Sequence, residues 1–244
     1  MQPLPAPSGE LLPRGGEIDA VLADLDVPPA RLRELTASFT DRERQRAASF
    51  AMDEWRNRWS AARGTLREVL GRALGLAPRA VALRYGPHGK PELDPACAKG
   101  AGELRFNLSH SGARALIGLA RVEVGADVEH LKKRRTDGIA RRFFVRGEQE
   151  RLFALAAASE REQAFFRLWT CKEAFLKVTG EGLSRSTRSY EIEVGPSGAR
   201  LLWAKGLPDA AQRFSVHPLD PGNGYAAALV AEAQGLELRR YRWP

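Results

Sequence analysis

The sequence predicts a mixed α/β (α+β) protein built from two consecutive units of about 120 residues each. The chain has 244 residues, which is enough for one large domain or two of modest size. In both units, helical patterns occur together with several short apolar strands, and no strict sequence repeat is visible. We place residues 17–121 in the first unit and residues 122–244 in the second. Residues 1–16 are rich in Pro and Gly, so we expect a flexible lead-in there.

The first unit is expected to begin with helices. Two prolines before residue 30 are compatible with the first turn of a short helix. Thr40 and Glu43 have the spacing of a capping box, in which the two side chains satisfy exposed N–H groups at a helix start. Helical periodicity then continues to about Leu74, in one piece or two, and Gly75 ends it.

Short strands follow, and the second unit again combines helices with strands. In the first unit we expect strands at residues 80–85, 104–109 and 113–121, and just after the boundary one at residues 124–130. In the second unit, helices are expected near residues 147–158 and 160–179, followed by strands at residues 189–194, 199–204, 212–217 and 225–233. Gly180 and Gly182 end the second of these helices.

The composition excludes several classes of protein. The longest uninterrupted apolar run, Leu152–Ala158, is far shorter than the ~20 residues of a membrane-spanning helix, and no signal peptide is visible. The two cysteines, Cys97 and Cys171, are too few for a disulfide framework or a thiolate zinc site, so we expect the reducing cytoplasm. The 38 basic and 30 acidic residues give a net charge of +8, which attracts an anionic partner. Neither a Cys/His zinc finger nor an RNA-recognition motif is present.

The segment from Gly125 to Glu129 is the first that indicates chemistry. Side chains alternate between the two faces of a strand, so Asp127 and Glu129 share one face. Two neighbouring carboxylates repel each other unless a cation or protons intervene. They are therefore candidate metal ligands, although an amphipathic strand whose polar face meets water has the same pattern.

Two further segments carry polar residues in patterns that suit a binding site. Trp169, Glu173 and Lys177 recur at every fourth position and form one stripe of a helix, although a surface Glu–Lys pair below a core tryptophan has the same spacing. His110 stands between two serines beside a glycine turn, where imidazole, hydroxyl and N–H groups can bind an anion. A capped hairpin turn is the alternative. Because neighbours on a strand face opposite ways, Ser109 and His110 are not expected to act as nucleophile and base.

Four motifs in this order and spacing resemble the 4′-phosphopantetheinyl transferases of the surfactin type. They are Gly89-Lys90-Pro91-Glu92-Leu93, Phe106-Asn107-Leu108-Ser109-His110-Ser111-Gly112, Gly125-Ala126-Asp127-Val128-Glu129 and Trp169-Thr170-Cys171-Lys172-Glu173-Ala174-Phe175-Leu176-Lys177. The resemblance extends from about residue 42 to residue 194, and more faintly to the end. It implies two similar halves related by a pseudo-twofold axis, with the cofactor in the cleft between them.

The resemblance also implies roles for individual residues. Asp127, Glu129 and Glu173 correspond to three Mg²⁺-binding carboxylates, and Glu173 would also be the base or the partner of a base water. Lys177 and Lys172 correspond to lysines at the pyrophosphate and the mouth of the site, and His110 to a histidine that contacts phosphate. Ser109 and Lys90 would contact coenzyme A, and Arg58 and Arg46 would lie near its 3′-phosphate. The chain departs from the family at Glu43, where a lysine is frequent, and in the lead-in.

The implied reaction transfers the 4′-phosphopantetheine arm of coenzyme A to a serine of an apo acyl or peptidyl carrier protein, with Mg²⁺ held by oxygen ligands. Such carrier proteins are typically acidic, so we expect the basic run Lys132–Arg135 to contribute to docking. We expect a cytoplasmic monomer with no nucleic-acid or membrane partner. Two other classes remain open: a Mg²⁺-dependent phosphodiester hydrolase with the same carboxylates, and a basic nucleic-acid-binding module.

Overall fold

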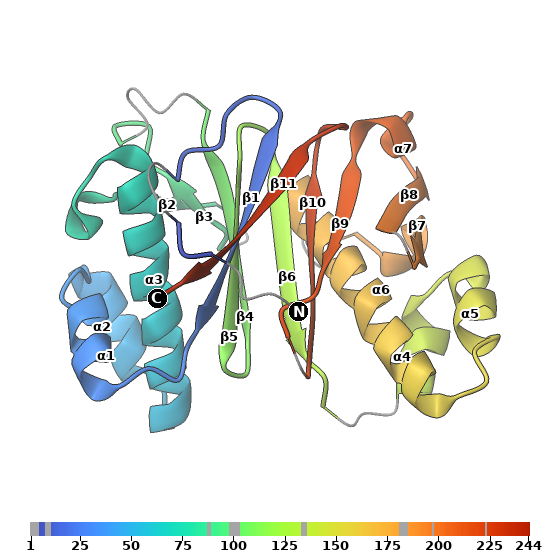
Figure 1. The fold of residues 1–244 in the computed structure, drawn as a ribbon, viewed down its shortest axis with the longest axis horizontal. Coiled ribbons are helices and arrows are strands. Elements are labelled where there is room, and N and C mark those ends of the chain that lie inside the picture. The colour runs from blue at the N-terminus through green and yellow to red at the C-terminus, as the bar shows by residue number, and fades with distance from the viewer. Residues whose placement is uncertain are drawn as a thin grey trace.

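Two β-sheets face each other in the middle of the molecule, and helices cover the outer side of each sheet (Figure 1). The computed structural model describes residues 5–7, 11–86, 89–97, 103–132, 136–180, 185–196, 198–222 and 224–244. The predicted mixed α/β class is confirmed. Among these residues, none of the helices combines the length and the apolar character that crossing a membrane requires.

The first half of the chain builds one layer of helices and most of one sheet. Its elements are β1 (Glu17–Asp24), α1 (Pro29–Thr36), α2 (Asp41–Ala48), α3 (Asp53–Leu74), η1 (Pro78–Ala80), β2 (Leu83–Tyr85), β3 (Pro91–Leu93), β4 (Arg105–Ser111) and β5 (Arg114–Ala120). The predicted capping box starts α2, because the Thr40 N–H donates to Glu43 Oε2 (2.9 Å) and the Glu43 N–H donates to Thr40 Oγ1 (3.3 Å). At the end of α3, Gly75 has a φ of 66°, a left-handed conformation that glycine adopts without strain.

The second half repeats this connectivity. Its elements are β6 (Val124–His130), α4 (Thr136–Phe143), α5 (Arg146–Phe153), α6 (Ala158–Thr179), η3 (Thr187–Ser189), β7 (Tyr190–Gly195), β8 (Gly198–Ala204), α7 (Ala210–Arg213), β9 (Ser215–Leu219), β10 (Tyr225–Ala231) and β11 (Glu237–Trp243). In the first half β5 pairs antiparallel with β1 and β4, and in the second half β10 pairs antiparallel with β6 and β9. The two halves therefore share an order of strand pairing, whereas a pseudo-twofold relation between them in space stays a prediction.

The last strand does not stay with the second half. β11 pairs parallel with β1, with Glu17 opposite Glu237 and Ala23 opposite Trp243. The sheets accordingly have the orders β11-β1-β5-β4 and β6-β10-β9-β8-β7. β11, which the predicted boundary assigns to the second unit, thus lies in the sheet of the first, while the boundary itself stays a prediction. Pairing with β11 satisfies the backbone groups of the β1 edge that β5 leaves open.

The segment before β1 is packed against the first sheet. Leu11 is fully buried among the apolar side chains between α3 and that sheet. The carbonyl of Pro13 accepts a hydrogen bond from Arg121 Nε (2.8 Å), and the carbonyl of Pro5 accepts one from the Arg242 N–H (3.0 Å). In its described residues this segment is not the flexible lead-in that its composition suggested, because one buried leucine outweighs the local effect of Pro and Gly.

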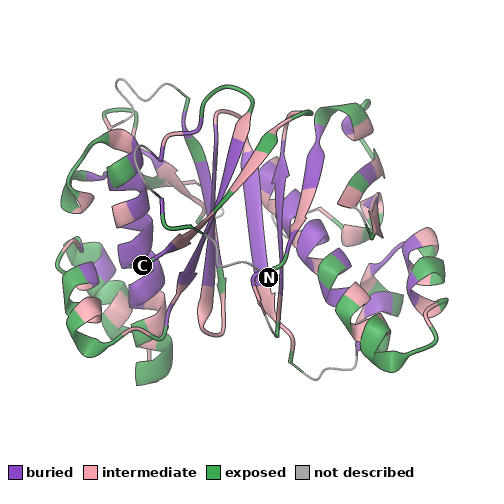
Figure 2. Cartoon of the chain, in the orientation of Figure 1, coloured by how far each residue is buried: buried purple, intermediate pink, exposed green. Residues whose placement is uncertain are grey.

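Apolar side chains form a layer between the two sheets and a layer between each sheet and its helices. Buried residues accordingly fill the facing strands and the inner sides of α3 and α6 (Figure 2). The middle layer is made largely of small side chains, such as Ala20 of β1, Ala126 and Val128 of β6, and Ala227 of β10. Small side chains let the sheets approach closely, and they bring the edge strands β4 and β6 to a common junction.

Gly125 lets α6 lie directly on β6. A Cβ atom at this position would stand 2.0 Å from the carbonyl oxygen of Ala174 and 2.6 Å from the nitrogen of Val178, both backbone atoms of α6. A backbone atom cannot move away without shifting the helix. The glycine therefore fixes the distance between the strand and the helix that carry the predicted carboxylates.

Gly125→Ala should destabilise the protein by at least about 3 kcal/mol, because overpacking here must displace backbone. Gly138→Ala is the matched control: no atom lies within 4 Å of its added Cβ, and it should gain up to about 1 kcal/mol from helix propensity. Urea denaturation of the two variants and the wild type measures both effects. Equal stability of Gly125→Ala and the wild type would contradict the close approach of α6.

Candidate functional site

The candidate site lies where β4, β6 and the last turns of α6 meet. Beside this junction, a pocket of about 270 Å³ opens between the two halves of the chain, and its lining includes Lys177 but none of the three predicted carboxylates. Residues that line it include Lys90, Pro91, Asn107, Leu108, Leu176 and Lys177. Elements from both halves therefore contribute to one pocket, as the predicted cleft requires.

Lys177 of α6 and Asp127 of β6 form the central contact of the site. Lys177 Nζ donates to Asp127 Oδ1 (2.6 Å), to Ser109 Oγ (3.0 Å) and to the carbonyl of Ala126 (3.0 Å). Asp127 is only 4% exposed, and burial raises its pKa although the Lys177 ammonium lowers it. Its second oxygen, Oδ2, is buried and has no hydrogen-bond partner among the described residues. The carboxylate thus keeps one oxygen for a further cation or donor.

Glu129 and Glu173 add two carboxylates to the same region. Ser111 Oγ donates to Glu129 Oε2 (3.0 Å). Glu173 lies one turn before Lys177 on α6 and is half-buried. Burial raises the pKa of Glu173 first, and the negative charges of Asp127 and Glu129 raise it further. The three predicted carboxylates therefore act on one another electrostatically, across a strand and a helix.

The donor set suits a divalent cation, although the side chains do not converge on a single point. In the part of the chain that the structure describes, no three His, Cys, Asp or Glu side chains stand close enough together to hold a metal ion. Asp127 nevertheless has an oxygen without a hydrogen-bond partner among the described residues, and the negative charges of Asp127 and Glu129 add to the effect of burial in raising the pKa of Glu173. Carboxylate oxygens are the ligands that Mg²⁺ prefers. The oxygen atoms of the three carboxylates are therefore of the kind that binds Mg²⁺.

His110 lies on the opposite face of β4 from Ser109, as the period of a strand predicts. It lines a cavity of about 150 Å³ together with Trp59, Arg63 and Leu108. Desolvation lowers the pKa of His110 first, and the positive charges of Lys177 and Arg63 lower it further. The charged groups that lower the pKa of the imidazole are therefore both cations.

Arg63 is a residue of this cavity that the motifs did not reveal. It is 8% exposed, and its Nε and Nη1 atoms have no hydrogen-bond partner among the described residues. Its nearest carboxylate, Glu43, is 3.8 Å from Nε and binds Arg67 at 2.9 Å instead. Burial lowers the pKa of Arg63. A buried guanidinium with free donors next to a histidine is suited to an anion. The only sequence signal is a pair of arginines four residues apart on an otherwise apolar helix face.

The two arginines that the resemblance connects with the 3′-phosphate have other partners. Arg58 forms a bidentate pair with Asp26 (2.6 and 2.8 Å), and this hydrogen bond raises its pKa. Arg46 is exposed and lies over the ring of Phe50, 4.7 Å from its centre. Neither lines the His110 cavity. Arg63, by contrast, does line that cavity.

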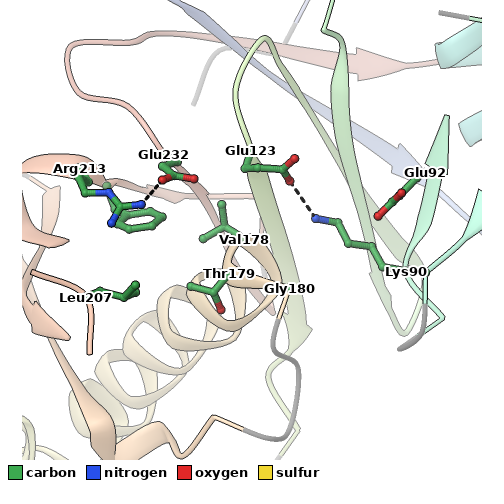
Figure 3. A pocket seen from close by; sticks show the side chains of 11 residues that line it. Lys90, Glu92, Glu123, Val178, Thr179, Gly180, Leu207, Arg213 and Glu232 are labelled. Atoms are coloured by element: carbon green, nitrogen blue, oxygen red, sulfur yellow. Dashed lines mark hydrogen bonds and ion pairs between the residues drawn. The ribbon is translucent and has the colours of Figure 1, made fainter. Parts of the chain in front are cut away.

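Lys90 lines both the pocket of about 270 Å³ and a second pocket. Its Nζ is 3.5 Å from Glu123 Oε2 and donates to the carbonyl of Lys177 (3.3 Å). Figure 3 shows the second pocket, of about 290 Å³, with the Lys90–Glu123 pair on one wall and the Arg213–Glu232 pair on the other. Lys90 therefore borders the pocket of about 270 Å³ from the first half of the chain. Glu92, which Figure 3 draws without a partner, pairs with Arg84 outside the view.

Lys172 does not belong to this group of side chains. It is fully buried, and its Nζ donates to both oxygens of Glu148 (2.7 and 2.9 Å) and to the carbonyl of Tyr190 (3.1 Å). Three acceptors use all three protons of the ammonium. Consecutive residues of a helix point about 100° apart, so Lys172 faces the interior while Glu173 faces the junction. The expected contact of Lys172 with the pyrophosphate is corrected accordingly.

Two expected features lie outside the described residues. The basic run Lys132–Arg135 is described only at Lys132, and residues 181–184, which include Gly182, are not described. Ser109, by contrast, is well defined. Its hydroxyl donates to Asp127 and accepts from Lys177 and from the Val128 N–H (3.3 Å), which fills its hydrogen-bonding capacity. This arrangement argues against the expected contact of Ser109 with coenzyme A.

Comparison with known proteins points to one family. Residues 123–230 match the model of the 4′-phosphopantetheinyl transferase superfamily. The chain is similar to the 4′-phosphopantetheinyl transferase HetI of Nostoc sp., with 36% identity over 221 residues that cover 90% of this chain and 89% of HetI. It is also similar to a 4′-phosphopantetheinyl transferase of Bacillus subtilis, with 26% identity over 229 residues that cover 92% of this chain and 98% of that protein. Sfp of Bacillus subtilis is 28% identical over 166 residues, 68% of this chain and 70% of Sfp.

A test of Lys172 separates a structural role from a role in ligand binding. Lys172→Met leaves Glu148 as an unpaired buried charge and should cost about 3–5 kcal/mol, measured by urea denaturation. The double variant Lys172→Met/Glu148→Gln removes that charge, so it should recover part of the stability and bind coenzyme A with wild-type affinity in calorimetry. If the double variant were as stable as the wild type and still bound coenzyme A more weakly, Lys172 would have a role in ligand binding.

Proposed function

The chain belongs to the 4′-phosphopantetheinyl transferase superfamily, and we propose that it carries out the family's reaction at the junction of β4, β6 and α6. It transfers the 4′-phosphopantetheine arm of coenzyme A to a serine hydroxyl of an apo carrier protein and releases adenosine 3′,5′-bisphosphate. The observation that carries the location is the buried Asp127 carboxylate, with one oxygen on Lys177 and the other without a partner among the described residues.

The side chains of the junction suit an attack on phosphorus. The serine oxygen bonds to the phosphorus that carries the pantetheine, and the bond from that phosphorus to the bridging oxygen breaks. The electron pair leaves with the bridging oxygen of adenosine 3′,5′-bisphosphate. Lys177 holds a positive charge at the wall of the pocket, where it offsets the charge of the pyrophosphate. Glu173 takes the serine proton directly or through a water.

Asp127, Glu129 and Glu173 would hold a Mg²⁺ ion. When bound, the ion supplies Lewis-acid chemistry and neutralises charge on the pyrophosphate. The partnerless oxygen of Asp127 and the mutual repulsion of the carboxylates support this assignment. A dication there would lower the pKa values that burial raises, so that the carboxylates are charged together.

The overall charge suits the partner. A net charge of +8 attracts an acidic carrier protein, so the rate of transfer should fall as salt screens the attraction. Both cysteines are free thiols, which fits the reducing cytoplasm. One chain contributes both walls of the pocket, which supports a monomer.

The reaction is tested by intact mass spectrometry of an apo carrier protein incubated with the enzyme, coenzyme A and Mg²⁺. The carrier should gain one phosphopantetheine arm, and EDTA should prevent the gain. Glu173→Gln should slow the transfer about 10²–10⁴-fold, since it removes the base and a metal ligand. Asp127→Asn should likewise lose transfer, and both variants should keep the circular dichroism spectrum of the wild type.

Other outcomes would separate the competing classes. A near-normal rate of either variant at saturating Mg²⁺ would contradict the assignment of the carboxylates. Cleavage of a phosphodiester without any carrier protein would favour the hydrolase. Salt-dependent binding of nucleic acid, with no response to coenzyme A, would favour the nucleic-acid-binding module.

The cavity of His110 and Arg63 suits the phosphate that does not react. The reacting pyrophosphate belongs on the Asp127 side of β4, whereas Arg63 and His110 lie on the α3 side. A phosphate monoester carries up to two negative charges, which match a buried guanidinium with two unpartnered nitrogens. Coenzyme A has such a group on its ribose, and dephospho-coenzyme A lacks it.

Arg63→Met should therefore weaken the binding of coenzyme A about 10- to 100-fold and leave the binding of dephospho-coenzyme A nearly unchanged. Calorimetry with both ligands measures the difference. Arg56→Met is the matched control, since Arg56 lies on the same helix and pairs with Asp53 at the surface. The ligand-free Arg63→Met protein should be at least as stable as the wild type, because it no longer buries an unbalanced charge. An equal loss of affinity for both ligands would contradict this role.

A further inference from the structure

Three polar side chains of β4 bind the backbone of β6. Asn107, Ser109 and Ser111 occupy alternate positions of β4, so they share one face of the strand. β4 and β6 are edge strands of different sheets, and their backbones are not paired with each other. Side chains supply the missing bonds: the Ala126 N–H donates to Asn107 Oδ1 (3.0 Å), the Val128 N–H to Ser109 Oγ (3.3 Å) and the His130 N–H to Ser111 Oγ (3.2 Å).

The two serines of this ladder also bind the two carboxylates of β6. Ser109 Oγ donates to Asp127 Oδ1, and Ser111 Oγ donates to Glu129 Oε2, both at 3.0 Å. A hydroxyl has one proton, so each serine binds one oxygen of its carboxylate. The backbone bond and the carboxylate bond of each serine involve neighbouring residues of β6. Each serine thus fixes both the position of the strand and the direction of the carboxylate on it.

We infer that Ser109 and Ser111 are positioning residues for the carboxylates that bind the metal, while Asn107 helps to hold the strand that carries these carboxylates. The inference rests on the proposed function, in which Asp127 and Glu129 hold Mg²⁺. In this role the serines act through the carboxylates and do not touch the substrate. A carboxylate that is already oriented loses less side-chain freedom when it binds a cation, so removal of its donor should weaken the metal site.

Ser111 offers the clearest test, because Ser109 also contacts Lys177 and its removal would disturb two groups. Ser111→Ala removes the donor to Glu129 and the acceptor of the His130 N–H. Ser111→Thr keeps the hydroxyl and suits a strand. Ser215→Ala is the matched control, since Ser215 is a buried serine of β9 in the same sheet as β6 but not adjacent to it.

Binding of Mn²⁺ to the coenzyme A-saturated enzyme, followed by electron paramagnetic resonance, is measured for each variant. Ser111→Ala should weaken Mn²⁺ about 10-fold or more, by the usual effect of removing a partner of a metal ligand. Ser111→Thr should restore most of the affinity, and Ser215→Ala should leave it unchanged. In the Glu129→Gln background, Ser111→Ala should cause no further loss. A full additional loss in that background would overturn the inference, because the serine would then act by another route.

Two further measurements keep the outcome unambiguous. Urea denaturation and amide hydrogen exchange at residues 126, 128 and 130 report whether β6 has come away from β4. Faster exchange at these amides with unchanged Mn²⁺ affinity would mean a purely structural ladder and would overturn the inference. Failure of the wild type to modify any carrier, with Mn²⁺ binding that still depends on Ser111, would contradict the proposed function alone. No Mn²⁺ binding by the wild type would overturn the inference.

Discussion

Lys177 connects the two halves of this chain, because it pairs with Asp127 of its own half and binds Ser109 of the other. A carboxylate in this apolar junction would be costly without a cation, and the Lys177 ammonium supplies one from α6. The same ammonium binds Ser109 of β4 and the carbonyl of Ala126 of β6, so one group joins both edge strands. This requires α6 to lie directly on β6, which Gly125 permits. The contact between Lys177 and Asp127 thus depends on the short distance between α6 and β6, which a side chain at residue 125 would increase.

A buried ion pair of the same design stabilises each half. Glu43 accepts the N–H that precedes α2 and also binds Arg67 of the long helix α3. Glu148 accepts the Val145 N–H that precedes α5 and also binds Lys172 of the long helix α6. In both cases a glutamate three residues into a short helix satisfies a helix start and a buried cation together. These pairs hold the short helices against the long ones, and they occur at corresponding points of the repeated connectivity.

Local chemistry made much of this arrangement predictable from the sequence, whereas contacts between distant segments were not. The face shared by Asp127 and Glu129 and the capping box at Thr40 follow from short periodicities, and both are present. The return of β11 to β1 joins residues more than 200 positions apart, which no local pattern encodes. Lys172 was misassigned because a motif lists neighbours but does not say which of them faces the core. Arg63 was missed because an arginine on a helix is usually a surface residue, and only the fold buries it.

The position of β4 at the edge of its sheet explains why one short motif can serve two parts of a ligand. Ser109 and His110 are neighbours in the chain, yet the alternation of a strand sends one toward the carboxylates of β6 and the other toward the cavity under α3. In the interior of a sheet, both faces of a strand would be covered by core. At an edge next to a second sheet, one face meets acidic groups that suit a cation, while the other meets Arg63, which suits an anion. A substrate with two separate phosphate groups can therefore span the strand, with the reacting group on the acidic side and the other group in the basic cavity.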